Sequence, residues 1–168
     1  MRTFALAAFL LLPALARAQS APRSIALQSG AAVQSGGSAA LVTPIALRAA
    51  WWIAERVDVT ARVGWAFAAR TEGRGADLVL EAGGGLRLAL SERALRPFAL
   101  ADVSAVQVLA PEALGSEAGA RLRTGGGIDW FFAPDLALGA EAMVGGTVLL
   151  SGRATLGAGL ELHVEAYF

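Results

Sequence analysis

The last fifteen residues of the chain, Ala154 to Phe168, read ATLGAGLELHVEAYF and alternate in polarity. One set of alternate positions is apolar, and the other set includes Glu161, His163 and Glu165. This period of two predicts a β-strand, because successive side chains on a strand point to opposite faces. Strands of about five or six residues are typical of soluble proteins, whereas a tilted strand crossing a bilayer needs roughly nine to eleven. The terminal stretch therefore predicts a transmembrane β-barrel.

The same alternation can be followed upstream and predicts an all-β, eight-stranded antiparallel up-and-down barrel. The predicted strands cover residues 25–33, 40–53, 56–69, 77–90, 97–109, 118–131, 136–150 and 154–168. In the second, third, fourth, sixth, seventh and eighth of them, the apolar face carries no charged residue, whereas charged residues lie on the opposite face. A charged side chain facing lipid costs about 2–4 kcal/mol at the bilayer midplane. We therefore assign the charge-free faces to lipid and the opposite faces to the lumen.

The fifth predicted strand alternates poorly. Asp102 and Ser104 occupy the same set of alternate positions as Phe98, Leu100 and Val106. Two interpretations stay open: a β-bulge resets the alternation within the strand, or the face assigned to lipid is the wrong one.

The N-terminus has the pattern of a secretory signal peptide. Arg2 is followed by an apolar segment over residues 4–15 and by a small-x-small cleavage site at residues 16–18. The apolar segment is shorter than the roughly 18 residues of a spanning helix. We expect cleavage after Ala18, which divides the chain into a signal peptide (1–18) and an outer-membrane β-barrel domain (19–168).

Composition supports export and a membrane location. The mean hydropathy is +0.54 and 55% of residues are hydrophobic, yet no segment after residue 18 offers 18 uninterrupted apolar residues. Closed barrels and helices are the only structures that satisfy the backbone within lipid, so the pattern favours a barrel. The mature chain has a net charge near −2, which argues against a nucleic-acid partner. Cysteine is absent, which excludes disulfides and thiolate metal sites.

The connections and the aromatic residues indicate an orientation. Short turns at 54–55, 91–96 and 133–135 alternate with longer or glycine-rich loops at 35–38, 70–76, 110–117 and 151–153. Outer-membrane barrels have short periplasmic turns and longer outer loops, so both termini are predicted to be periplasmic. Aromatic residues at the strand ends predict girdles at the two interfaces. The predicted girdle residues are Trp51, Trp65, Phe67, Phe98, Trp130 and Phe168.

Three stretches carry a family resemblance: residues 96–98 (RPF), residues 125–139 (GGGIDWFFAPDLALG) and the terminal Phe168. On these stretches the chain resembles the small eight-stranded outer-membrane β-barrel proteins of Gram-negative bacteria, the OmpA/OmpX-like group. The resemblance implies an outer-membrane location, outer-membrane lipid as partner, and a monomer. It also implies that the barrel-insertion machinery recognises Phe168 as the assembly signal.

The lumen is predicted to be filled with charged side chains, because an eight-stranded barrel has an interior just wide enough for side chains to fill it. Arginine–carboxylate pairs can plug such a lumen and stabilise it without disulfides. The predicted lumen network comprises Arg48, Arg62, Glu81, Arg87, Arg121, Arg123, Asp129, Glu141, Glu161, His163 and Glu165.

The row Glu161-x-His163-x-Glu165 has two interpretations. Residues two apart on a strand lie about 6–7 Å apart, whereas a zinc site needs three or four ligands about 2 Å from the metal, so lumen residues paired with arginine are favoured over a metal site. No catalytic residue, cofactor or metal is predicted. The function predicted is a structural or interaction barrel with a plugged lumen. A narrow channel or small-ligand transporter is the alternative, and a barrel enzyme acting on lipid comes third.

Overall fold

The computed structural model describes residues 23–35, 40–70, 76–91, 93–110 and 115–168. The predicted signal peptide and parts of three predicted outer loops lie outside these described residues. Within the described part of the chain, no helix is long and apolar enough to span a membrane.

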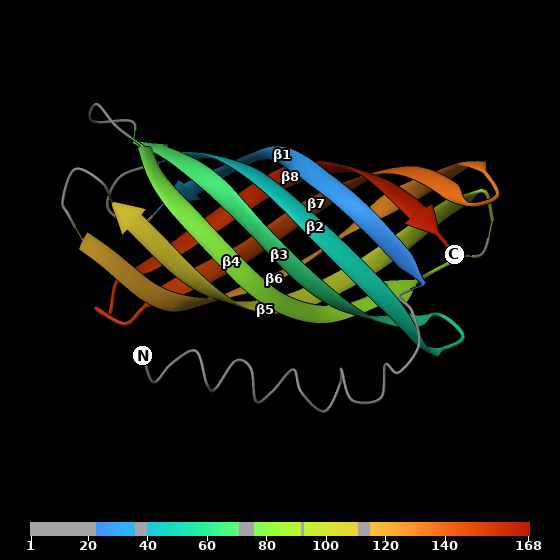
Figure 1. The fold of residues 1–168 in the computed structure, drawn as a ribbon, viewed down its shortest axis with the longest axis horizontal. Coiled ribbons are helices and arrows are strands. Elements are labelled where there is room, and N and C mark those ends of the chain that lie inside the picture. Colours follow the sequence, from blue (N-terminus) through green and yellow to red (C-terminus); the bar gives the residue numbers. More distant parts are fainter. Residues whose placement is uncertain (1–22, 36–39, 71–75, 92, 111–114) are drawn as a thin grey trace.

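Eight antiparallel strands form a closed barrel in which every strand pairs with its neighbours in sequence and β1 pairs with β8 (Figure 1). This confirms the predicted fold. The strands are β1 (Ser24–Ser35), β2 (Ala40–Ala54), β3 (Val57–Arg70), β4 (Ala76–Ala89), β5 (Leu95–Ala110), β6 (Gly115–Ala133), β7 (Leu136–Leu149) and β8 (Ala154–Tyr167).

The two ends of the barrel differ in their connections. We call the end with the connections β2–β3, β4–β5 and β6–β7 the turn end; β1 starts and β8 finishes there. The opposite end, with the connections β1–β2, β3–β4, β5–β6 and β7–β8, is the loop end. The β7–β8 connection is a tight turn that contains Gly152, whose φ of 87° is one that L side chains rarely adopt.

Strand β6 is longer than predicted, with 19 residues. Its pairing with β5 extends to Gly115 opposite Ala110, and its pairing with β7 extends to Ala133 opposite Leu136. Register shifts occur at the turn end of β2, between Trp52 and Ala54, and of β6, between Phe131 and Ala133. Bulges at a barrel rim re-aim the side chains beside them.

Strand β5 resolves the alternatives that its sequence left open. Its pairing with β4 runs without a register shift from residue 98 to residue 109, so no bulge resets the alternation. Phe98, Leu100, Asp102, Ser104 and Val106 are all buried inside the barrel. The assignment of Phe98 to an aromatic girdle is therefore wrong: its side chain lies in the lumen, with 2% of its surface exposed. Apolar residues on this inward face had made it resemble a lipid face.

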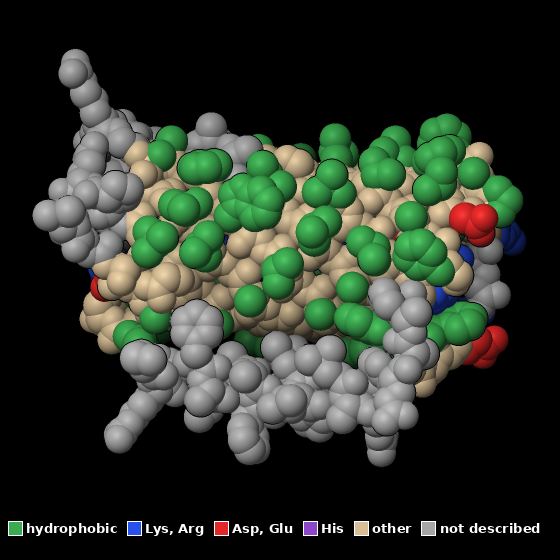
Figure 2. All heavy atoms as spheres, viewed as in Figure 1, with side chains coloured by type: hydrophobic (Ala, Val, Ile, Leu, Met, Phe, Trp, Pro, Cys, Tyr) green, Lys and Arg blue, Asp and Glu red, His purple; other side chains and the backbone are tan. Residues whose placement is uncertain are grey.

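The outer surface is apolar between its rims. Figure 2 shows hydrophobic side chains spread over the viewed face, with charged side chains near its ends. Large exposed side chains include Leu122, Leu156, Leu160 and Leu162, each with more than 60% of its surface accessible. Among the described residues, the exposed aromatic side chains are Trp52, Trp65, Phe67, Trp130, Phe132 and Phe168, and Trp51 is half-buried. Soluble monomers rarely expose an apolar surface of this extent, whereas lipid would cover it.

The lumen contains three successive layers. Toward the loop end lies an apolar cluster of Val42, Ala66, Ala68, Val79, Val106 and Leu149. At the turn end, the rings of Phe131 and Tyr167 lie 5.0 Å apart, and the Arg96 guanidinium lies 4.4 Å from the centre of the Phe131 ring. Between these two layers lie the charged side chains that form the candidate site.

Candidate functional site: the charged lumen

Twelve charged or titratable side chains meet in the middle layer of the lumen. The structure places all eleven predicted lumen residues on the inward face and adds Asp102, which follows from the phase of β5. Seven of the eight strands contribute, because each supplies inward residues at alternate positions. Even the most accessible of these side chains, Arg121, has only 13% of its side-chain surface exposed.

Six of these residues form what we call the turn-side cluster: Arg48, Arg87, Asp129, Glu141, His163 and Glu165. The Arg87 guanidinium donates to Asp129 and, at 3.0 Å, to Glu165. It also lies 4.1 Å from the centre of the Phe98 ring, a cation–π contact. Arg48 donates to Glu141 at 2.9 Å and lies 3.6 Å from Glu165. Two arginines are therefore shared among three carboxylates.

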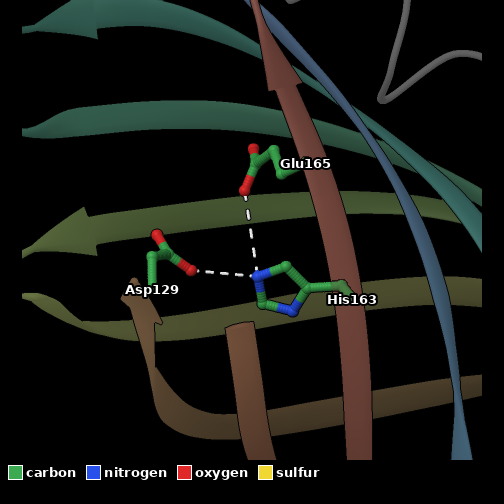
Figure 3. A group of neighbouring side chains, drawn as sticks. All are labelled: Asp129, His163 and Glu165. Carbon is green, nitrogen blue, oxygen red and sulfur yellow. Dashed lines mark hydrogen bonds and ion pairs between the residues drawn. The ribbon is translucent and has the colours of Figure 1, made fainter. Parts of the chain in front are cut away.

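His163 lies at the centre of the turn-side cluster and has no exposed side-chain surface. Its Nε2 atom is 2.9 Å from Asp129 Oδ1 and 3.9 Å from Glu165 Oε2. Figure 3 shows both carboxylates directed at this one nitrogen. The opposite nitrogen, Nδ1, lies 3.8 Å from Glu141, beyond hydrogen-bonding distance.

Gly139 makes room for the His163 ring. It pairs with His163 across the β7–β8 ladder, and a Cβ atom built on it would lie 2.2 Å from His163 Nε2. Any larger residue at position 139 would displace either the imidazole or the Asp129 carboxylate, whose Oδ1 atom would lie 2.8 Å from that Cβ. The position of the histidine thus depends on a glycine of the neighbouring strand.

The other six residues form what we call the loop-side cluster: Arg62, Glu81, Asp102, Arg121, Arg123 and Glu161. Glu81 is approached by three guanidiniums, with Arg121 Nη1 at 2.9 Å, Arg62 Nε at 3.1 Å and Arg123 Nη1 at 3.8 Å. Arg123 donates to both carboxylate oxygens of Asp102, at 3.0 and 3.1 Å. The charges balance here, with three arginines and three carboxylates. Bidentate pairs of this kind fix geometry as well as adding energy.

The group most like a metal site is Asp129, His163 and Glu165, whose ligand atoms all lie within 4.8 Å of one another. Arg87, however, already pairs with both carboxylates of this group. A metal ion would have to compete with that buried guanidinium for the same oxygens. The arrangement is therefore better suited to neutralising Arg87 than to holding a cation.

Several lumen contacts involve residues outside the predicted charge network. Gln28 donates to Glu141 at 3.0 Å, and the Ser24 hydroxyl donates to Glu165 at 2.5 Å. Near the turn end, Arg23 pairs with Asp58 at 3.3 Å. Alternation places Ser24 and Gln28 on the inward face of β1, but the sequence does not distinguish uncharged side chains that make specific hydrogen bonds from those that only fill the lumen. Asp58 lies on the inward face of β3, and Arg23 precedes β1.

Comparison with known proteins identifies the fold but no family of related sequences. No protein-family model matches the sequence, and neither does any curated protein. Among solved structures, the chain is similar to Neisserial surface protein A, NspA, with a TM-score of 0.67 and 11% identity over 86% of this chain and 96% of that chain. It is similar to the outer-membrane enzyme PagL, with a TM-score of 0.59 and 12% identity over 84% and 99%.

A third similar structure is Ail, the attachment invasion locus protein of Yersinia pestis, with a TM-score of 0.52 and 13% identity over 84% of this chain and 96% of that chain. The structural alignment with this eight-stranded barrel covers nearly the whole length of each of these three proteins. The chain therefore has the fold of the small outer-membrane β-barrels.

Proposed function

We propose that this protein is an integral barrel of the outer membrane with a structural or interaction role, and that its lumen is closed by arginine–carboxylate pairs. Its immediate partners are outer-membrane lipid and, during assembly, the barrel-insertion machinery; the barrel acts as a monomer. The likeness to small outer-membrane barrels and the apolar outer surface support this location.

The observation that carries the closed lumen is the burial of its central guanidiniums. Arg48, Arg62 and Arg87 are at most 6% exposed, and each contacts two carboxylates. An open aqueous pore would leave such side chains accessible to water along its length. The buried ion pairs within each cluster instead favour a barrel that holds its shape and does not conduct.

A narrow channel is the competing function. A cavity of about 70 Å³ lies in the loop half of the lumen, beside Arg121, Arg123 and Glu161. The inward glycines Gly145 and Gly157 line this cavity. A channel would require the cavity to connect past the turn-side cluster, where the guanidiniums are most deeply buried.

A lipid-acting enzyme is the third candidate, and the position of the histidine speaks against it. A nucleophile at the lipid surface needs a base within hydrogen-bonding reach. The one histidine of the sequence is His163, which faces the lumen and contacts carboxylates. The exposed hydroxyl residues Ser29 and Thr124 lie on the outer surface, on the other side of the barrel wall.

The experiment is expression of the full chain in a Gram-negative host, followed by membrane fractionation and planar-bilayer recording of the purified barrel. We expect outer-membrane fractions, heat-modifiable gel migration and little or no conductance. A large, stable wild-type conductance would overturn the closed lumen and establish the channel. Recovery in soluble or inner-membrane fractions would overturn the location.

A further inference from the structure

The two charged clusters adjoin each other, because Arg48 of the turn-side cluster pairs with Arg62 of the loop-side cluster across β2 and β3. Within the described lumen, no hydrogen bond and no ion pair within 4.0 Å joins a residue of the turn-side cluster to a residue of the loop-side cluster. Glu141 and Glu165 pair with arginines of the turn-side cluster, and Glu81 and Glu161 pair with arginines of the loop-side cluster. The clusters are therefore not coupled by a direct polar contact.

A small void lies at this junction. Its volume is about 10 Å³. Its lining includes Arg48, Arg87 and Glu141 from the turn-side cluster and Arg62 and Asp102 from the loop-side cluster, together with Gln28. Side chains of both clusters thus line one enclosed space.

Unpartnered polar atoms belong to the side chains around this void. Arg48 Nε, Arg87 Nε and Gln28 Oε1 are buried and have no hydrogen-bond partner. Their residues are 5%, 3% and 1% exposed. Burying such atoms without partners is unfavourable, and most buried polar groups in proteins are satisfied by protein or by ordered water.

We propose that this void is a binding site for a single ordered water molecule that links the two clusters. A void of about 10–15 Å³ holds one water, provided that it has two to four polar partners. Water can accept from the guanidinium N–H groups and donate to Gln28 Oε1 or to a carboxylate. The inference goes beyond the proposed function, because it concerns how the two clusters are coupled, whichever partner the barrel has.

Charge and size exclude the competing occupants. A metal cation would meet three guanidiniums, those of Arg48, Arg62 and Arg87, against the two carboxylates of Asp102 and Glu141. A halide would meet suitable donors, but it is larger than a water molecule, and the two clusters already contain six carboxylates against five guanidiniums. A neutral molecule that both donates and accepts is the occupant that matches this lining.

The first test is a high-resolution crystal structure of the full-length protein, with and without bromide in place of chloride. We expect a single peak of electron density in the void, with the height of a water and within hydrogen-bonding distance of Arg48 or Arg87 and of Gln28. An empty void, or an anomalous bromide peak at this position, would overturn the proposal.

The second test measures coupling in solution by urea unfolding of the barrel in detergent. Gln28→Met removes the acceptor on the turn side, and Asp102→Asn alters the loop side of the same void; the two residues share no direct contact. We expect the double variant to differ by more than about threefold in unfolding constant from the product of the single effects.

Glu81→Gln is the matched control, because Glu81 belongs to the loop-side cluster but does not line the void. Combined with Gln28→Met it should be additive within about twofold, as expected for independent sites. Equal coupling in both pairs would overturn a water-mediated link. If a variant does not fold, the crystallographic result on the wild-type protein decides alone.

Discussion

Replacing Arg87 by methionine should cause a large loss of stability. The substitution keeps an unbranched side chain of similar length and removes the charge. It leaves Asp129 and Glu165, whose side chains are 0% and 1% exposed, without their shared guanidinium. Removing one partner of a buried ion pair costs about 3–5 kcal/mol, because the remaining charge stays buried and uncompensated.

Two neighbours set where in that range the value falls. His163 still contacts Asp129 and Arg48 still approaches Glu165, which limits the loss. The contact of Arg87 with Phe98 is also removed, which adds about 0.5–2 kcal/mol for a desolvated cation–π pair. We therefore expect a decrease of about 4 kcal/mol in the free energy of unfolding.

The assay is urea-induced unfolding of the barrel in lipid vesicles, followed by tryptophan fluorescence and analysed by linear extrapolation. Arg153→Met is the matched control: Arg153 pairs with Glu117 at the rim, with 65% of its side chain exposed, and should lose at most about 1 kcal/mol. The double variant Arg87→Met/Asp129→Asn should recover part of the loss. An Arg87→Met effect no larger than that of the control would refute the reasoning.

Three further predictions concern other parts of the barrel. Gly139→Ala should destabilise the barrel by about 1–3 kcal/mol through overpacking against His163, measured by the same unfolding assay; a neutral result would contradict the close approach of the ring. Leu160→Arg at the middle of the lipid face should cost about 2–4 kcal/mol, whereas Leu150→Arg at the rim should cost about 0–1; equal values would argue against a bilayer around this face. Arg123→Ala should produce at most a small leak in planar bilayers, above a nearly silent wild type, and a wide stable conductance in the variant would show that this one side chain had closed a pore.

The number, order and direction of the strands could be predicted from the sequence, because alternation is a local property. Most faces were assigned correctly for the same reason: a charge on the lipid side is costly, and the sequence avoids it. Strand β5 shows where this fails. Phe98 and Leu100 face the lumen, and Ala99 and Ala101 face outward, so size and hydrophobicity indicated the wrong face. The charged residue in the middle of that strand, Asp102, was the correct guide.

The pairing of charges could not be predicted. Alternation places Arg62 and Glu161 in the lumen, but their contact joins positions 99 residues apart on strands that are not neighbours. Such contacts depend on the stagger of the strands around the barrel and on the length of each side chain. The division into two clusters, and the void between them, likewise depend on three-dimensional packing that no local pattern records.

The pairing of β1 with β8 has a consequence for assembly. The amide of Phe168 donates to the carbonyl of Arg23, and Ser24 pairs with Tyr167. The hydrogen bond from Ser24 to Glu165 spans 141 positions of the sequence. Until this seam forms, two strand edges expose backbone groups that the hydrocarbon cannot satisfy. Insertion should therefore be all-or-none, and a chain shortened by one strand should not persist in the bilayer as a smaller barrel.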